Sequence, residues 1–225
     1  MGCDFCDERL GKNTIYNKIY GIKNRTVFET ENYWVFPSIG QIREGHLLIA
    51  TKKHVNSIGH LNKPLTDELN NLILMLHDFY EKMYGLDMMC FEHGVLNDDG
   101  NQGGCGIYHM HLHLLPIKDD EFFSVLERLK NEEINIVTQT EGIEETHTCV
   151  RLQQTYVYVA YMDKEGNQNA FIITRKSNAF ESQYMRKVVS NVLGNNEWDW
   201  RSNTNQEEIA FLETVKKSSS YFRLI

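Results

Sequence analysis

The sequence predicts an α+β fold in which helices pack on an antiparallel sheet, and three patterns carry this prediction. Two short runs of β-branched and aromatic residues, with a polar turn between them, are typical of a hairpin within 26–36. An amphipathic pattern predicts a long helix at 65–84. Two further strands, at 88–95 and 107–116, enclose a glycine-dense loop. This order of elements is typical of an α+β fold.

The helix at 65–84 also carries signals for both of its ends. Apolar side chains recur three or four residues apart along it and give one buried stripe. Thr66 is expected to cap its N-terminus, and Gly85 fits its C-terminal end. A strand at 45–51 is predicted between the hairpin and this helix.

The C-terminal half differs from the first half in composition. Beyond Pro116–Asp120 the chain becomes acidic, and this run is expected to be a solvated face. The chain is therefore divided into a first domain at 1–118 and a β-β-α extension at 119–225, which could be a degenerate second half. The predicted strands and helices of the extension lie at 155–162, 170–175, 181–193 and 206–217.

Length and charge exclude several classes of protein. The chain has 225 residues, 41% of them hydrophobic, so it can bury a core. Its 23 Lys and Arg against 31 Asp and Glu give a net charge of −8, which disfavours binding along a nucleic-acid backbone. Apolar runs stay far below the ~20 residues of a membrane span, and no signal peptide is visible. We therefore expect a cytoplasmic protein without a membrane partner.

Cysteine use agrees with a reducing compartment. The five cysteines are an odd number in a chain without an export signal, which disfavours a disulfide framework. Cys3 and Cys6 form a Cys-x-x-Cys pair. In a reducing compartment such a pair indicates metal binding, redox chemistry or an inert pair of thiols.

The strongest chemical signal is the run His109-Met110-His111-Leu112-His113. Residues two apart share one face of a strand, so the three histidines point one way and the apolar residues point toward a core. Three interpretations stay open: an exposed polar face, a metal site made of all three histidines, and nucleophilic catalysis by a neutral imidazole. The adjoining loop with Gly103, Gly104 and Gly106 favours catalysis, because its backbone N–H groups can approach an anion.

At this point the sequence resembles the histidine triad (HIT) superfamily. Its signature is His-x-His-x-His followed by two apolar residues, and 109–115 matches it in full. Residues 31–54 resemble a second block of the family, which contains Gly-His, an apolar strand and Lys-x-His. The similarity covers roughly residues 1–117, about half of the chain.

The resemblance implies a role for each site residue. His111 would be the nucleophile that attacks an α-phosphorus, His113 would hydrogen-bond the phosphate or leaving-group oxygen, and His46 would line the same site. Ser38 stands where the hydrolytic branch often has an Asp that holds the ribose hydroxyls. The phosphate and nucleotide would be bound by the loop residues Gly103, Gly104, Cys105, Gly106 and Ile107.

The resemblance also implies a structural zinc. Family members with an N-terminal Cys-x-x-Cys hold the ion with ligands that correspond here to Cys3, Cys6, His54 and His109. Two thiolates and two imidazoles make a closed tetrahedral set, as a structural zinc site requires. This assignment removes His109 from catalysis.

The sequence departs from the family in two places. Nucleotide-binding members usually carry Gln-Ser after the Gly-Gly pair, whereas this chain has Cys105-Gly106. The Gly-Cys pair is reminiscent of the galactose-1-phosphate uridylyltransferases, but that branch replaces the third histidine with glutamine, and His113 is intact here.

These residues lead to three functional hypotheses. The first is a zinc-containing nucleotidyl hydrolase that cleaves a nucleoside monophosphate from a phosphoramidate, dinucleoside polyphosphate or related donor. The second is a nucleotidyltransferase or phosphorylase of the uridylyltransferase type, and the third is a non-catalytic nucleotide-binding module. The expected partner is a small nucleotide rather than nucleic acid, and a homodimer is possible. The base and the leaving group stay open.

Overall fold

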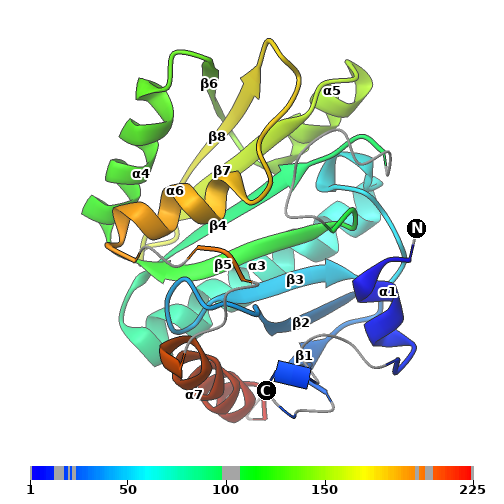
Figure 1. The fold of residues 1–225 in the computed structure, drawn as a ribbon, viewed down its shortest axis with the longest axis vertical. Helices are drawn as coiled ribbons and strands as arrows, with labels where there is room; N and C mark the ends of the chain where they lie inside the picture. Colours follow the sequence, from blue (N-terminus) through cyan, green and yellow to red (C-terminus); the bar gives the residue numbers. More distant parts are fainter. Residues whose placement is uncertain are drawn as a thin grey trace.

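The computed structural model describes residues 2–12, 18–19, 21, 24–97, 107–195, 198–200 and 205–223 (Figure 1). The strands are β1 (Phe28–Glu29), β2 (Tyr33–Pro37), β3 (Leu47–Thr51), β4 (Asp87–Gly94), β5 (His111–Ile117), β6 (Asn135–Thr140), β7 (Tyr156–Met162) and β8 (Gln168–Arg175). The α-helices are α1 (Asp4–Arg9), α3 (Lys63–Tyr84), α4 (Asp119–Asn131), α5 (Thr146–Arg151), α6 (Tyr184–Val192) and α7 (Asn205–Phe222). Two short 3₁₀ helices, η1 (Ile58–His60) and η2 (Ile143–Glu145), precede α3 and α5.

The described strands form one eight-stranded sheet in the order β1-β2-β3-β5-β4-β7-β8-β6. Every neighbouring pair is antiparallel, so the predicted α+β fold is confirmed. Strand β5 lies between β3 and β4, and its His113 is opposite Leu48 on one side and Phe91 on the other. The histidine strand is therefore in the interior of the sheet, where its register is fixed on both edges.

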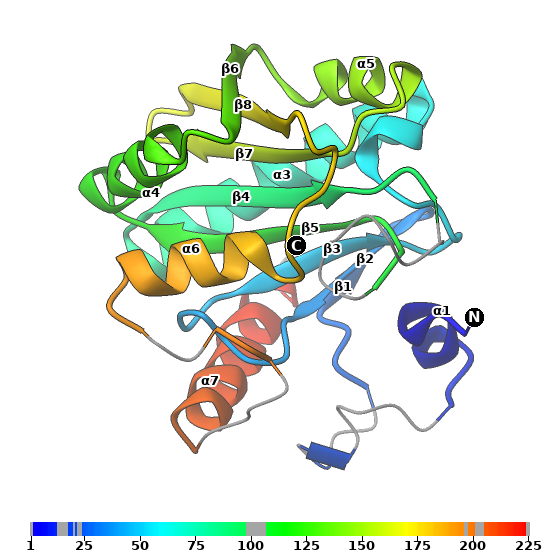
Figure 2. The same ribbon diagram turned by 45° about the horizontal axis from the view of Figure 1, so that its top comes forward.

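Helices cover both faces of the sheet. Helix α3 lies behind the sheet in Figure 1, while α4 and α6 lie in front of it, and Figure 2 shows the same three layers from another side. Leu112 and Leu114 of β5 pack into the core under α3. Phe91 of β4 packs on the opposite side with Val125 of α4 and Val188 of α6. The alternation of side chains along each strand separates the two cores.

Helix α3 begins before the predicted residue, and the expected cap is wrong. The Asn62 side chain accepts a hydrogen bond from the backbone N–H of Leu65, so Asn62 is the N-cap. Thr66 lies one turn into the helix and donates its hydroxyl to the Asn62 carbonyl. Gly85 ends the helix with φ of 63°, a left-handed conformation that favours glycine.

The C-terminal half contains more structure than the predicted β-β-α extension. Helix α4 and strand β6 occupy the acidic stretch that was expected to be only a solvated face. Helix α4 is amphipathic: Phe122, Val125 and Leu129 are buried, while its acidic residues face outward. Helix α5 also precedes β7. The acidic residues on the exposed face of α4 dominate its composition, and the apolar stripe of this helix was therefore not recognised in the sequence.

The two halves share an order of elements. Strand β3 leads through η1 and α3 to β4 and β5, and β6 leads through η2 and α5 to β7 and β8. The sheet order β3-β5-β4-β7-β8-β6 is symmetric about the β4–β7 pair. This repeat supports the hypothesis of a degenerate second half, and the division after residue 118 stays a prediction. Among the described helices, none has the length and apolar character to cross a membrane.

Candidate active site and metal cluster

The histidines occupy the start of β5 and the bend before it. Strand β5 begins at His111 rather than at residue 107, so His109 lies just outside it. His109, His111 and His113 are 2%, 6% and 3% exposed. Met110 is in the core under α3, and Phe5 of α1 packs edge-on against both His109 and His111. The histidines therefore share the face opposite α3, although they are buried and not on an open surface.

The backbone fixes the protonation state of the His111 ring. Its Nδ1 atom lies 2.6 Å from the carbonyl oxygen of His109, and a carbonyl can only accept, so Nδ1 carries the hydrogen. Burial and, to a smaller extent, the positive charge of Arg186 lower the pKa of His111 to about 4, although the hydrogen bond to the His109 carbonyl partly offsets this. The ring is therefore neutral near pH 7, with an unprotonated Nε2 that can act as a nucleophile.

A second chain of hydrogen bonds orients His113. The backbone N–H of Ile42 donates to His46 Nδ1 at 3.4 Å, so the hydrogen of the neutral His46 ring is on Nε2. This Nε2 lies 2.9 Å from His113 Nδ1, which must accept. His113 then carries its hydrogen on Nε2. The Phe91 ring stacks on His113 with centroids 4.4 Å apart and fixes the plane of the imidazole.

Burial keeps this pair of histidines neutral. Loss of hydration lowers the pKa of both His46 and His113 well below the usual value. The charge of Arg186 and the neighbouring histidines lower both pKa values further. A neutral His113 can donate from Nε2 to an oxygen that gains negative charge.

Four ligand-type side chains meet beside the triad. The ligand atoms of Cys3, Cys6, His54 and His109 all lie within 4.8 Å of one another. His109 Nδ1 is 3.3 Å from Cys3 Sγ and 3.7 Å from Cys6 Sγ, and His54 Nδ1 is 3.5 Å from Cys6 Sγ. Zinc bonds of about 2.3 Å to sulfur and 2.0 Å to nitrogen at tetrahedral angles separate sulfur from nitrogen by roughly 3.5 Å. These residues therefore fit a metal ion without rearrangement.

Neighbouring residues orient the His109 ring as a metal ligand requires. Its Nε2 atom lies 2.7 Å from the Thr51 carbonyl oxygen, so Nε2 carries the hydrogen and Nδ1 faces the two cysteine sulfur atoms. Metal-binding histidines are commonly held in this way by a carbonyl. Helix α1, which carries Cys6, is anchored by a buried pair in which Arg25 donates to both carboxylate oxygens of Glu8 at 2.9 and 2.8 Å.

The predicted nucleotide-binding residues are only partly described. Gly103, Gly104, Cys105 and Gly106 lie outside the described residues. Ile107 is partly buried against the cluster around Phe5. Ser38 is buried beside His46: its N–H donates to the His46 carbonyl at 2.9 Å, and its hydroxyl accepts from Arg186 at 3.3 Å.

Three further residues of this region lie outside the predicted site residues. Arg186 comes from α6, far along the chain, and only its place beside an apolar helical stripe could have indicated burial. The structure buries His93 of β4 on the face of the triad, whereas Glu92 points to the α3 side and accepts hydrogen bonds from Tyr156 and Ile58. Thr51 contacts His109 Nε2 through both its backbone carbonyl and its hydroxyl, and no motif of the sequence indicates this contact.

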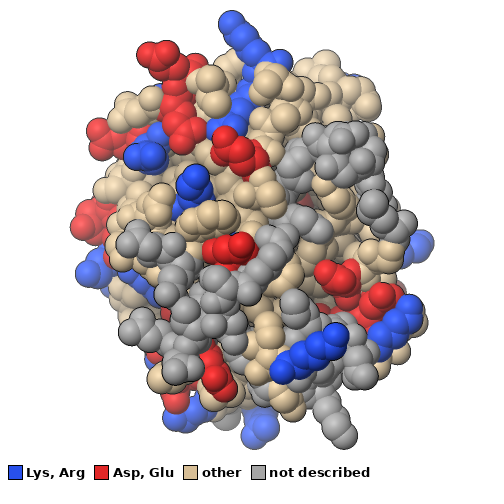
Figure 3. All heavy atoms as spheres, in the orientation of Figure 1, with Lys and Arg blue, Asp and Glu red and all other residues tan. Residues whose placement is uncertain are grey.

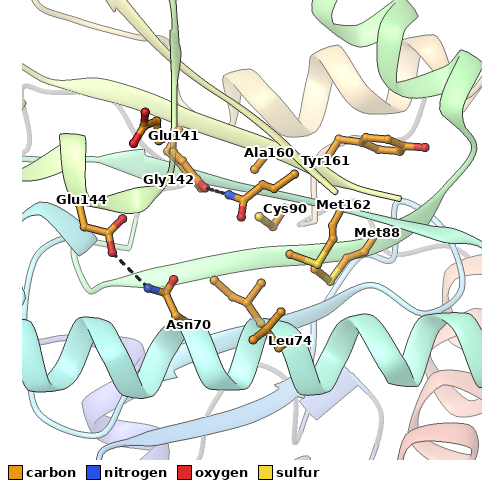
Figure 4. Close-up of a pocket in the computed structure, with 13 residues that line it drawn as sticks. Asn70, Leu74, Met88, Cys90, Glu141, Gly142, Glu144, Ala160, Tyr161 and Met162 are labelled. Atoms are coloured by element: carbon orange, nitrogen blue, oxygen red, sulfur yellow. Dashed lines mark hydrogen bonds between the residues drawn. The ribbon is translucent and has the colours of Figure 1, made fainter. Parts of the chain in front are cut away.

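A separate cavity lies on the other face of the sheet (Figure 4). It has a volume of about 270 Å³ and is lined by Asn70 and Leu74 of α3, Met88 and Cys90 of β4, and Glu144 among others. Along β4, Met88 and Cys90 point into this cavity, whereas Phe91 contacts the ring of His113. The sheet therefore separates the cavity from the histidines.

The surface charge is mixed. On the face drawn in Figure 3, the coloured Lys and Arg side chains are interspersed with Asp and Glu. Among the described residues on this face, the basic side chains do not form a continuous stripe.

Three alternating histidines, two on a central strand and one in the bend before it, lie beside a cluster of two cysteines and two histidines, an arrangement typical of a histidine triad site. Residues 21–120 match the family model described as "HIT domain". Over these residues the chain therefore matches the HIT domain family, and the resemblance found in the sequence is confirmed over them.

Individual relatives resemble part of the chain. "Protein hit" of Bacillus subtilis is 26% identical over 111 residues, which cover 47% of this chain and 71% of that protein. An uncharacterized HIT-like protein of Methanocaldococcus jannaschii is 29% identical over 97 residues, covering 42% of this chain and 70% of that protein. The crystal structure of a HIT family hydrolase from Legionella pneumophila is 26% identical, covers 52% of this chain and 95% of that one, and has a TM-score of 0.35.

Proposed function

We propose that the protein is a nucleotidyl hydrolase that uses His111 as its nucleophile. The observation that carries this proposal is the hydrogen bond from His111 Nδ1 to the His109 carbonyl. It leaves the lone pair of Nε2 available in a buried, neutral ring. Burial alone would be served by an apolar residue, so this orientation supports a chemical role.

The reaction would proceed in two balanced steps. His111 Nε2 forms a bond to the α-phosphorus of the donor, and the bond from phosphorus to the leaving group breaks with its electron pair. His113 Nε2–H hydrogen-bonds the oxygen or nitrogen that gains this charge. Water then attacks the phosphorus of the nucleotidyl-histidine: its oxygen bonds to phosphorus as the P–Nε2 bond breaks, and the electron pair of that bond returns to His111 Nε2. The proton that the water loses balances the one that the leaving group takes up, and the nucleoside monophosphate is released.

Zinc would hold the site together and take no part in the bond changes. Cys3, Cys6, His54 and His109 would bind it, and the ion would fix α1 and the bend before β5 relative to each other. None of the four described cysteines is in a disulfide, which supports function in a reducing compartment such as the cytoplasm. A homodimer stays a prediction.

Intact-protein mass spectrometry tests this proposal. The protein is mixed with adenosine and guanosine phosphoramidates, dinucleoside polyphosphates and nucleotide sugars, with His111→Ala as the control. We expect a nucleotidyl adduct or free monophosphate with wild type and neither with His111→Ala. Wild-type turnover in His111→Ala would refute the nucleophile. An adduct that persists in water until an acceptor is added would favour the transferase alternative.

A further inference from the structure

Gln41 lies in the loop between β2 and β3, which also carries His46, and its side chain is only 2% exposed. Its Nε2 donates to the backbone carbonyls of Ser38 at 2.7 Å and of His46 at 2.9 Å. Its Oε1 lies 3.1 Å from the His46 N–H and 2.9 Å from the Thr214 hydroxyl. Because a carbonyl can only accept, the amide has one orientation, and all its hydrogen-bonding positions have a partner within reach. A fully satisfied buried network of this kind makes a loop rigid.

Thr214 brings helix α7 of the C-terminal half to this loop (Figure 2). Its buried Oγ1 accepts from the backbone N–H of Gly45 at 2.7 Å. Its hydroxyl hydrogen has two acceptors within reach, Gln41 Oε1 and the Ala210 carbonyl one turn earlier on α7. Tyr80 of α3 donates to the Gly45 carbonyl at 2.8 Å. Both polar backbone groups of Gly45 are therefore held by side chains of helices.

The same loop determines how the His46 ring is held. Ile42, the residue after Gln41, donates its N–H to His46 Nδ1 at 3.4 Å, a distance near the upper limit for a hydrogen bond. A small shift of the loop would therefore break this contact. Without it, either ring of the His46–His113 pair can donate to the other across their 2.9 Å contact. The anchors of the loop thus decide which nitrogen of His113 carries the hydrogen.

We propose that Gln41 and Thr214 are positioning residues of the histidine site, and that helix α7 thereby sets the atom of His113 that donates to the leaving group. This inference rests on the proposed function and assigns a part in it to the C-terminal half of the chain. The contacts run from Thr214 and Gln41 to the Ile42 N–H, and from there through His46 to His113. Loss of either anchor is expected to spare the nucleophile and to remove the fixed donor.

The kinetic test compares two donors that share one nucleoside and differ in the leaving group. A p-nitrophenyl phosphodiester releases a stable phenolate that needs little help, whereas a phosphoramidate releases its amine only when the nitrogen gains a proton. Gln41→Met should lower kcat/KM for the phosphoramidate by about 10- to 100-fold, the size of an acid–base contribution. The loss on the p-nitrophenyl ester should stay within about threefold, because that leaving group depends little on a donor.

A matched series at Thr214 removes and restores one hydroxyl. Thr214→Val keeps the shape of the side chain and should lower kcat/KM for the phosphoramidate by about fivefold, the size of one hydrogen bond. Thr214→Ser keeps the hydroxyl and should stay within about twofold of wild type. Thr66→Val is the control, because Thr66 is also a buried helical threonine that donates to the carbonyl one turn earlier. It lies about 20 Å along α3 from Tyr80 at roughly 1.5 Å per residue, and its change should affect neither donor.

NMR of the ring nitrogens reads the tautomers without turnover. The full-length protein is labelled with ¹⁵N-histidine, and His113→Gln assigns the His113 signals. In wild type and Thr214→Ser we expect the hydrogen of His113 on Nε2, whereas Gln41→Met and Thr214→Val should show a mixture of the two tautomers. Circular dichroism checks that each variant folds, and Thr214→Val decides if Gln41→Met does not.

Three results would overturn the positioning role. These are an unchanged kcat/KM for the phosphoramidate in the folded variants, an equal loss on both donors, and a His113 tautomer that is the same in Gln41→Met and Thr214→Val as in wild type. Failure of the proposed function looks different, because wild type would then form neither adduct nor product from either donor. The NMR signals of His113 would still test the positioning role in that case.

Discussion

His46 Nε2 lies 2.9 Å from His113 Nδ1, and both rings are fully buried. The contact joins the loop before β3 to β5, and it sets the His113 ring with its hydrogen on Nε2. The backbone N–H of Ile42 starts this chain of hydrogen bonds. Three groups in a row thus determine which atom of His113 can donate into the site.

Replacement of His46 tests this chain. His46→Leu fills the buried space but removes the acceptor for Ile42 and the donor to His113. Because His113 then loses its preferred tautomer, we expect kcat to fall by about 10- to 100-fold, in line with the size of acid–base contributions, with a smaller change in KM. Steady-state kinetics measures this. His77→Gln on α3 is the matched control, and an unchanged kcat in folded His46→Leu would contradict the assignment.

Replacement of Cys3 tests the proposed metal cluster. Cys3→Ser replaces a thiolate with a poor zinc ligand, so metal analysis should find about one equivalent of zinc in wild type and little in the variant. Loss of the ion releases α1 from the triad bend, and we expect the melting temperature to fall by about 5–10 °C. Cys149→Ser lies outside the cluster and should keep its zinc. Full zinc content in Cys3→Ser would disprove the four-ligand set.

The buried pair Arg25–Glu8 is expected to carry much of the docking of α1. The two side chains are only 3% and 5% exposed, so Glu8→Gln leaves the Arg25 charge buried beside a neutral partner. Loss of one partner of such a pair costs about 3–5 kcal/mol. Urea unfolding measures the change. Lys63→Met removes one partner of the exposed Lys63–Asp67 pair and should cost under about 1 kcal/mol; equal effects of the two substitutions would contradict the prediction.

Glu92 should make stability fall as pH rises. Burial raises its pKa from 4.5 to about 8, although Tyr156 and the Ile58 N–H partly offset this. Between these values the unfolded carboxyl is ionised while Glu92 keeps its proton. The free energy of unfolding therefore loses about 1.4 kcal/mol per pH unit from this group. The contribution is fully present below pH 4.5 and is lost as pH approaches 8.

Glu92→Gln isolates this effect. Its amide can still accept from the Ile58 N–H and reach the Tyr156 hydroxyl, but it does not ionise. Chemical denaturation at several pH values should show that the difference between Glu92→Gln and wild type grows from pH 5 toward pH 8. The exposed Glu127→Gln on α4 serves as the control. A difference that is constant with pH would mean that Glu92 is ionised throughout.

Local patterns predicted the elements of the first half well. The strands near 45–51 and 88–95 and the helix near 65–84 were found because each has a clear period and a terminal signal such as Gly85. The cap was placed at Thr66 instead of Asn62, because the signals for a helix start extend over several neighbouring residues. Helix α4 and β6 were missed because the acidic residues of α4 and of the segments on either side of β6 dominate the composition there.

The sequence alone determined which residues are the candidates for the site. The alternation of His109, His111 and His113 with apolar residues requires one polar and one apolar face, and the types of Cys3, Cys6 and His54 indicate a metal. Only the tertiary structure decided the tautomers and the neighbours. The ring of His46 and the charge of Arg186 reach the site through folding, and hydrogen bonds between residues far apart in the chain have no local sequence period.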